Sequence, residues 1–190
     1  MLSNLNKYRV VLASQSPRRR ELLSGLEIEF DTANIDVEEN YPDDLEAEEI
    51  PCFLAEKKAA SYHLDENTLL ITADTIVWLD GIVYGKPRDK TDAKRMLRAL
   101  SAKTHQVITG VCVKTRQKQK VFAVITNVTF ATIADEDIDY YLNKFKPYDK
   151  AGSYGIQEWI GYVAVERIEG SYFNVMGLPV QRLYTELKKF

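Results

Sequence analysis

The order of apolar and polar positions predicts short strands that alternate with helices. Tyr8–Ala13 is a β-branched apolar run that ends in small polar residues, which is typical of a strand entering a turn. Pro17 then opens a segment in which Leu22, Leu23 and Leu26 recur at helical spacing. The same periodicity predicts further helices over Ile50–Leu64, Asp92–Leu100 and Asp135–Lys144, and from Pro179 onward.

Four runs rich in β-branched residues predict the central strands. Leu69–Thr72 and Ile76–Leu79 are separated by a short interruption around Asp74, whereas Gln106–Lys114 and Val121–Ala131 flank a polar turn, which favours an antiparallel hairpin. Because strict strand–helix alternation is absent, we expect an α/β fold with a mixed twisted sheet flanked by helices. No internal repeat or linker divides the chain, so residues 1–190 are interpreted as one domain.

Composition and charge narrow the classes of function. The 190 residues include 25 Lys and Arg against 28 Asp and Glu, a formal net charge of −3, so no global positive field attracts nucleic acid or anionic membranes. The first residues show no signal pattern, and no apolar run approaches the roughly 18 residues that cross a bilayer. Cys52 and Cys112 lack the spacing of metal ligands. We therefore expect a soluble cytoplasmic protein with no nucleic-acid or membrane partner.

Three consecutive arginines occupy a place where a helix disfavours cations. Ser16 is a good N-cap and Pro17 a good first helical residue, which puts Arg18–Arg20 in the first turn. A helix N-terminus carries about half a positive charge, so cations are unfavourable there unless an anion is bound. The segment therefore predicts a local phosphate site. The alternative is that the arginines pair with the acidic run Asp43–Glu49, which is itself interpreted as a solvated face rather than a lid.

Asp74 is a lone carboxylate in a strongly apolar environment. Burying it without a partner would be costly, so it must be paired, hydrated or bound to a metal ion. Two interpretations are equal on this evidence, namely a residue at a functional cleft and a structural aspartate that satisfies turn amides. Among the lysines Lys86 is the most specific, because Gly85 and Pro87 fix the backbone on either side of it.

The segment Asp149–Gln157 has the composition of a ligand-binding loop. Its glycines allow a ligand to approach the backbone, and Gln157 offers a donor and an acceptor side by side, which would suit a nucleobase edge. A simple turn between strands is an equal alternative. His105 is interpreted as a hydrogen-bonded packing residue rather than a catalyst. The P-loop, dinucleotide-binding, zincin and serine-hydrolase motifs are absent from the sequence.

Eight motifs in a fixed order resemble those of the Maf family of nucleoside triphosphate pyrophosphatases. From about Val10 to Pro179 they are SxSPRRxELL, Glu38-Glu39, LAxxKA from Leu54, ADT from Ala73, GKP, SxxTHxVxTxV from Ser101, DKAGxYGIQ and GxYxxVxGLP from Gly170. The resemblance implies an inosine-triphosphatase-like fold with two lobes around a cleft, and a homodimer. It also implies hydrolysis between the α- and β-phosphates of a nucleoside triphosphate, giving a monophosphate and pyrophosphate.

The resemblance also assigns roles to individual residues. Asp74 matches the acceptor of a proton from the attacking water, and Glu39 together with Asp74 would hold a Mg²⁺ or Mn²⁺ ion. The positions that match contacts to the triphosphate are Ser14, Arg18, Arg19, Lys58 and Lys86.

Base preference is implied by three further matches. Arg18, Thr75 and Gln157 resemble the subgroup that acts on dTTP and UTP, rather than a relative that acts on 7-methyl-GTP. Gln157 can meet the O4 acceptor and the N3–H donor of thymine or uracil, but the same amide turned over could equally meet cytosine. The positions that depart from the family pattern, and could alter the rim of the base pocket, are Lys146, Ser153 and Glu158.

Two alternative functions stay open on the sequence. The first is a pyrophosphatase for modified pyrimidine nucleotides, with dTTP and UTP as merely convenient substrates. The second is a nucleotide-sensing regulator of cell division with little turnover, since the family name derives from an effect on septum formation. The complete acidic and basic set argues against the regulator, because a sensor gains nothing from a carboxylate that activates water.

Overall fold

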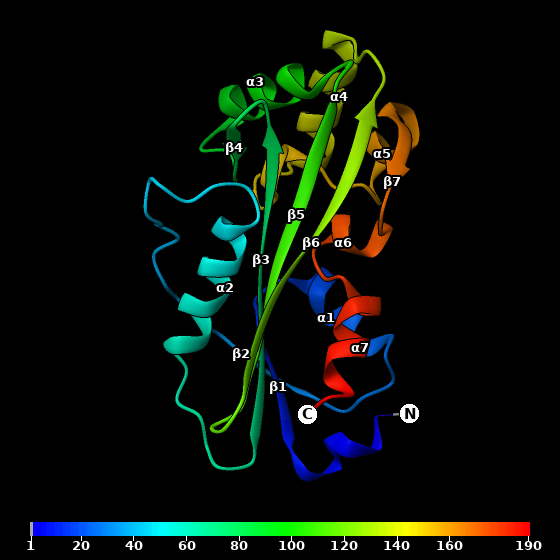
Figure 1. The fold of residues 1–190 in the computed structure, drawn as a ribbon. Helices are drawn as coiled ribbons and strands as arrows, with labels where there is room; N and C mark the ends of the chain where they lie inside the picture. The colour runs from blue at the N-terminus through cyan, green and yellow to red at the C-terminus, as the bar shows by residue number, and fades with distance from the viewer. Residues whose placement is uncertain (1) are drawn as a thin grey trace. The chain divides into compact units, whose positions relative to one another are not determined.

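The computed structural model describes residues 2–190 of the chain, drawn as a ribbon in Figure 1. Helices and strands follow one another irregularly along the sequence. In chain order the elements are the 3₁₀ helix η1 (Ser3–Lys7), β1 (Arg9–Ala13), α1 (Pro17–Ser24), β2 (Asp31–Ala33), α2 (Glu49–Ala60), β3 (Thr68–Leu79), β4 (Ile82–Tyr84), α3 (Lys90–Leu100), β5 (Thr104–Lys114), β6 (Gln119–Phe130), α4 (Asp135–Phe145), the 3₁₀ helix η2 (Ala151–Ser153), α5 (Trp159–Ala164), β7 (Val165–Glu169), α6 (Tyr172–Met176) and α7 (Val180–Leu187).

The strands form a seven-stranded mixed sheet. Its order is β2-β1-β3-β5-β6-β7, with β4 paired to β3. Strand β1 runs parallel to both β2 and β3, whereas β3 with β4 and β6 with β7 are antiparallel. Strands β5 and β6 are neighbours joined by only four residues, a connection that permits only an antiparallel pair. The predicted mixed α/β sheet and its hairpin are therefore confirmed.

The prediction of two separate strands around Asp74 is wrong. The structure has one continuous strand, β3, in which Asp74 is an interior residue that is 7% exposed. Apolar and β-branched residues continue on both sides of the carboxylate and keep the backbone extended, so the turn interpretation of Asp74 is also wrong. The helix predicted over Ile50–Leu64 ends at Ala60, and α3 begins before Asp92 because the Asp89 side chain accepts a hydrogen bond from the Asp92 amide (2.8 Å).

The chain divides into two compact units. Unit 1 comprises the described part of Met1–Asp74 with Thr109–Val124 and Gly177–Phe190, and unit 2 comprises Thr75–Ile108 and Ile125–Met176. The boundary falls inside β3, β5 and β6, so each of these strands contributes residues to both units.

The core of unit 1 beside α2 is built from small residues. Ala55 and Ala59 of α2 are buried with Val11 of β1 and Leu70 of β3. The helix approaches β5 equally closely at Gly110, where a Cβ atom would lie only 2.3 Å from the Pro51 carbonyl carbon. Small side chains and this glycine therefore let α2 lie directly on the sheet.

Unit 2 has a larger apolar core beneath α3 and α4. Met96, Leu97 and Leu100 of α3 pack with Ile138 and Leu142 of α4, and all five are buried. Among residues 2–190 no helix combines the length and the apolar character that crossing a membrane requires.

Candidate active site

The two predicted carboxylates of unit 1 meet at the ammonium group of Lys58. Its Nζ lies 2.6 Å from Asp74 Oδ1 and 3.0 Å from Glu39 Oε1. The Lys58 and Asp74 side chains are 13% and 10% exposed, whereas the Glu39 side chain is 43% exposed. One buried cation thus joins a buried carboxylate to a solvent-facing one, although the three residues come from α2, β3 and the loop after β2.

The periodicities of a helix and a strand bring Lys58 to Asp74. Thr72 and Asp74 are two residues apart in β3 and therefore point to the same face, while Ala55 and Lys58 are three apart in α2 and share one side of the helix. The Thr72 hydroxyl donates a hydrogen bond to the Ala55 carbonyl at 2.6 Å. This hydrogen bond holds α2 against β3 one helical turn before Lys58. The ion pair between Lys58 and Asp74 forms on the same face of β3.

The arginine segment forms the predicted strand, turn and helix. The Ser16 hydroxyl caps α1 by accepting a hydrogen bond from the Arg19 amide (3.4 Å), and Pro17 is the first helical residue. The Arg19 Nε donates to the Gly177 carbonyl at 2.8 Å. Burial lowers the pKa of Arg19, and the charges of Asp74 and Glu39 counteract that lowering. Arg19 thus lies within the electrostatic reach of the carboxylates that contact Lys58.

Arg18 and Ser14 lie in the same part of unit 1. Arg18 is partly buried, and its charge contributes to lowering the pKa of Arg19, as expected for two neighbouring cations. The Ser14 hydroxyl accepts a hydrogen bond from the Ser16 amide at 3.2 Å. Concentrating like charges in this way favours the binding of an anion.

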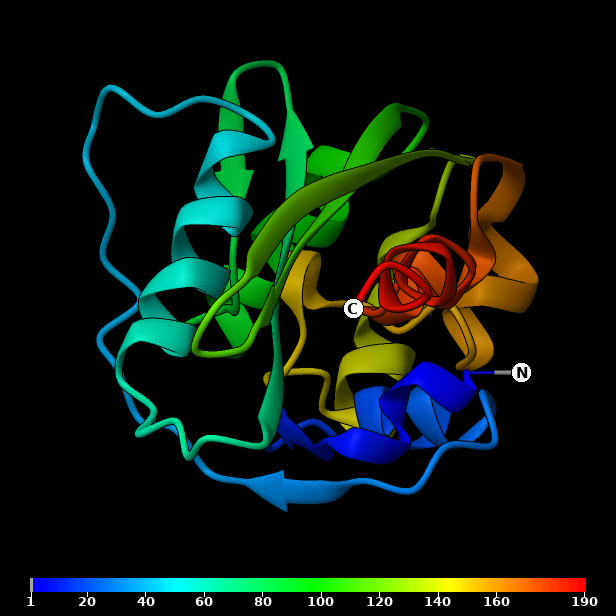
Figure 2. The ribbon, with the colours of Figure 1, turned by 60° about the horizontal axis from the view of Figure 1, so that its bottom comes forward.

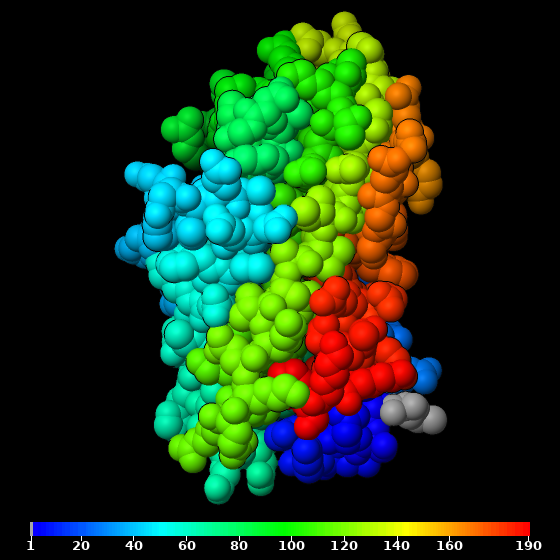
Figure 3. Space-filling view, in the orientation of Figure 1, coloured from blue at the N-terminus to red at the C-terminus, as the bar shows by residue number. Residues whose placement is uncertain are grey.

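The loop between β2 and α2 supplies Glu39 and then passes along the outer side of α2 (Figure 2). All five carboxylates of its Asp43–Glu49 run are exposed, and the end of this loop lies on the face of the molecule shown in Figure 3. The expectation of a solvated acidic face agrees with this exposure.

The other predicted residues belong to unit 2. Thr75 directly follows Asp74 in β3, and exposed Lys86 lies in the turn after β4. The Gly152 amide donates to the Gly85 carbonyl at 3.1 Å, so the turn that contains Lys86 is tied to the loop that leads to Gln157. Of the three predicted specificity residues, Arg18 is in unit 1, whereas Thr75 and Gln157 are in unit 2.

The Gln157 side chain is the clearest sign of a ligand in unit 2. Its Oε1 atom is buried and has no hydrogen-bond partner. Leaving an amide oxygen unsatisfied typically costs about 1–3 kcal/mol, so such a group is normally completed by water or a bound molecule. The acceptor atom of the edge predicted for Gln157 is therefore unsatisfied within the protein.

His105 is a packing residue, as predicted. It is 1% exposed, its Nε2 lies 2.7 Å from the Tyr154 hydroxyl, and its ring packs edge-on against Phe130. Burial lowers the pKa of His105 to about 4, so the ring is neutral at physiological pH.

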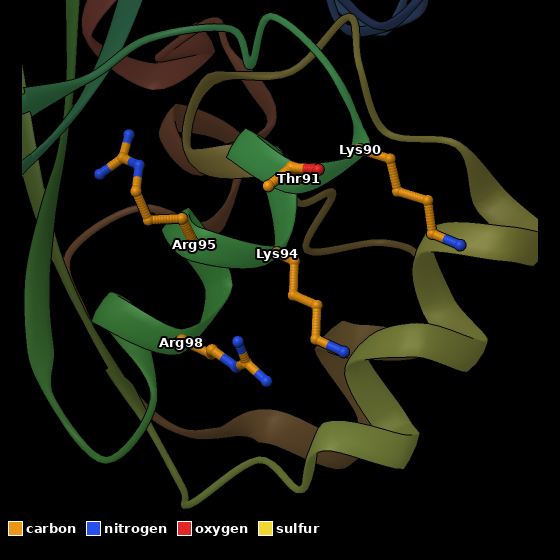
Figure 4. A pocket seen from close by; sticks show the side chains of 5 residues that line it. All are labelled: Lys90, Thr91, Lys94, Arg95 and Arg98. Atoms are coloured by element: carbon orange, nitrogen blue, oxygen red, sulfur yellow. The ribbon is translucent and has the colours of Figure 1, made fainter.

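A pocket on α3 is separate from these residues. Its volume is about 460 Å³, and the lining side chains are Lys90, Thr91, Lys94, Arg95 and Arg98 (Figure 4). Lys94 points toward α4 and contacts Asp139 at 2.6 Å, while Arg98 pairs with Asp135. The positive charge is thus offset by carboxylates, and none of the predicted site residues lines this pocket.

A family model described as Maf-like protein matches residues 9–190. The chain belongs to the Maf family. Relatives in Phocaeicola vulgatus, Bacteroides fragilis and Flavobacterium johnsoniae are each named dTTP/UTP pyrophosphatase and are 63%, 58% and 49% identical. The first two alignments cover 100% of both chains, and the third covers 96% of this chain and 95% of the relative. A solved HAM1 protein from Coxiella burnetii is 17% identical, with a TM-score of 0.47 over 96% of this chain and 100% of that chain.

Two contacts of this Maf protein were not predicted from its sequence. The first is the Gly177 carbonyl that accepts from Arg19; Gly177 has φ +115°, a conformation that glycine adopts readily. The second is the hydrogen bond that the hydroxyl of Tyr141 in α4 donates to Glu158. A buried tyrosine hydroxyl usually has a partner, and this was the signal that could have found it.

Proposed function

We propose that this chain hydrolyses dTTP and UTP between the α- and β-phosphates, releasing the nucleoside monophosphate and pyrophosphate. The observation that carries the proposal is the contact of Lys58 with both Asp74 and Glu39. It unites a candidate base, a second carboxylate and a phosphate-binding cation. The names of the full-length relatives support the same activity.

In the proposed reaction, Asp74 accepts a proton from the water that attacks the α-phosphate. The acceptor is a side-chain oxygen of an interior residue of β3, a strand that lies between β1 and β5 in the sheet, so it can orient water as well as take its proton. Lys58 and Arg19 offset the charge of the triphosphate, with the α1 N-terminus behind Ser16 adding its dipole. Further contacts to the triphosphate are proposed for Ser14, Arg18 and Lys86.

The two carboxylates also fit a divalent metal ion. Among residues 2–190 no group of three or more His, Cys, Asp or Glu side chains could hold a metal ion. Mg²⁺ does not require such a group, because it is commonly bound through one or two carboxylates together with substrate phosphates. Glu39 and Asp74 would hold Mg²⁺ or Mn²⁺, which would offset charge on the phosphate oxygens.

Base recognition is proposed to depend on Gln157. Its buried Oε1 would accept the N3–H of thymine or uracil, and its amide nitrogen would donate to O4. Thr75 and Arg18 are proposed as the other specificity residues.

We also propose a cytoplasmic location, a single functional domain and a homodimer. A nucleotide substrate and the two free thiols of Cys52 and Cys112 support the location. The dimer follows from the resemblance to the family, and light scattering of the purified chain tests it. A molar mass of one chain at all concentrations would contradict the dimer.

The deciding experiment measures pyrophosphate and orthophosphate release from dTTP, UTP, CTP, dCTP, ATP and 7-methyl-GTP with Mg²⁺, Mn²⁺ or no metal. Pyrophosphate from dTTP and UTP is the expected result. Modified pyrimidine triphosphates are included because a much higher kcat/KM with one of them would change the proposed substrate. Orthophosphate release would contradict the assigned bond, and tight binding without turnover would favour the nucleotide-sensing regulator.

A further inference from the structure

An ion pair of one buried and one partly buried side chain closes the loop that holds Gln157. Lys150 Nζ lies 3.1 Å from Glu158 Oε1, and the two side chains are 10% and 19% exposed. Lys150 begins this loop and Glu158 ends it, immediately before α5. Lys150 also contacts Asp149 at 2.8 Å, but the Asp149 side chain is 59% exposed, so Glu158 is its more buried carboxylate partner. Neither member of this pair has a role in the proposed hydrolysis.

The Tyr141 hydroxyl holds the same loop from α4. It accepts a hydrogen bond from the Gly155 amide at 3.0 Å and donates one to Glu158 Oε2. These two residues lie on either side of Gln157 in the sequence. Tyr141 is fully buried and stacks on Phe145, so its hydroxyl is a fixed point for the backbone around Gln157.

Gly155 makes room for the ion pair. A Cβ atom at this position would lie 2.9 Å from Glu158 Cδ and 3.0 Å from Lys150 Cε. A side chain here would therefore push the two charged groups apart. Gly155, the ion pair and the tyrosine hydroxyl thus form one connected set of contacts around the loop.

We propose that Lys150, Glu158 and Tyr141 act as a clamp that fixes the direction of the Gln157 amide and thereby determines which pyrimidine is accepted. The inference rests on the proposed function. A glutamine amide can serve uracil in one orientation and cytosine in the other, so discrimination requires neighbours that hold one orientation. The clamp holds the Gly155 amide and the Glu158 side chain, and so restrains the loop on both sides of Gln157. The three are positioning residues and do not touch the reacting atoms.

The test compares kcat/KM for UTP and CTP in the full chain with Tyr141→Phe, Glu158→Gln, Lys150→Met and Lys150→Arg. The first three variants should lower the UTP-to-CTP ratio about tenfold, the effect of losing one hydrogen bond, mainly through a higher KM for UTP with kcat nearly unchanged. Lys150→Arg keeps the ion pair and should keep the wild-type ratio. Lys94→Met is the matched control, because it breaks a lysine–carboxylate pair between α3 and α4 in which no residue of the loop takes part.

Hydrogen exchange of the Gly155 amide reports on the clamp without depending on substrate. It should become at least about tenfold faster in Tyr141→Phe, which removes its acceptor, and stay unchanged in Lys94→Met. An unchanged exchange rate in Tyr141→Phe would overturn the clamp. Faster exchange with an unchanged UTP-to-CTP ratio would overturn its role in specificity. If the wild type itself does not distinguish UTP from CTP, the proposed base recognition fails, and the exchange rate still shows whether the clamp exists.

Discussion

Replacing Asp74 by asparagine separates the proposed chemistry from substrate binding. The amide has nearly the shape of the carboxylate, and its oxygen can still accept a hydrogen bond from Lys58. In the unsubstituted chain this hydrogen bond is 2.6 Å long. Lys58 also keeps Glu39 at 3.0 Å, so we expect a stability loss of only about 1–2 kcal/mol. The proton acceptor, however, is lost. A positioned general base contributes roughly 10²–10⁴-fold, so kcat should fall by that factor, or about 3–5 kcal/mol in activation free energy.

The assay is pyrophosphate release from dTTP under saturating conditions, with nucleotide affinity measured separately by calorimetry. Measured without a divalent metal ion, so that the proposed role of Asp74 in holding the metal does not enter, the affinity should stay the same or increase, because the substitution removes a negative charge from the site of a polyanion. Asp139→Asn is the control, because Asp139 of α4 contacts Lys94 at the same distance of 2.6 Å. This substitution should change kcat by less than about twofold. If Asp74→Asn retained the turnover of this control, Asp74 would not be the base.

Three further predictions concern buried groups outside the reaction. The pKa of His105 falls from 6.5 to about 4 on folding, so the free energy of unfolding should decrease by about 3 kcal/mol as the pH falls from 6.5 to 4. Urea titrations of His105→Phe should lack this pH-dependent decrease. Gly110→Ala, with its Cβ 2.3 Å from the Pro51 carbonyl carbon, should cost roughly 3 kcal/mol in the same titrations; an unchanged midpoint would refute the close packing. Burial raises the pKa of Cys52 from 9.0 to about 11, so iodoacetamide at pH 8 should alkylate it about a hundredfold more slowly than a cysteine with an unshifted pKa, and denaturant should abolish the difference.

Local patterns predicted the elements, and the exceptions have physical causes. The Ser16 cap and Pro17 defined the start of α1 correctly, because capping depends on neighbouring residues alone. The break predicted at Asp74 was wrong because a polar residue does not end a strand when its charge has a partner. That partner, Lys58, lies in another element, so no pattern local to β3 could reveal it.

The sequence named candidate site residues but not the contacts between them. The capped arginine segment favoured Arg19 as a phosphate-binding cation, whereas Lys58 was implied only by the resemblance to the family, and the pattern around Asp74 left that residue evenly divided between a functional and a structural role. The structure adds the Thr72–Ala55 hydrogen bond, which places α2 on β3 and so explains the ion pair. It likewise shows contacts next to Gln157 in the chain that sequence spacing could not supply, because Tyr141 of α4 contacts Gly155 in the loop.

The contact between Lys58 and Asp74 links binding to catalysis in the proposed reaction. Lys58 Nζ lies 2.6 Å from Oδ1 of Asp74, so this oxygen already accepts a charge-assisted hydrogen bond and is less open to a water molecule. Phosphate oxygens would compete with Asp74 for Lys58, since they are also anionic acceptors. A bound triphosphate would therefore both draw Lys58 toward itself and free the oxygen that takes the proton. The same lysine would thus restrain Asp74 before the substrate arrives and bind the substrate when it does.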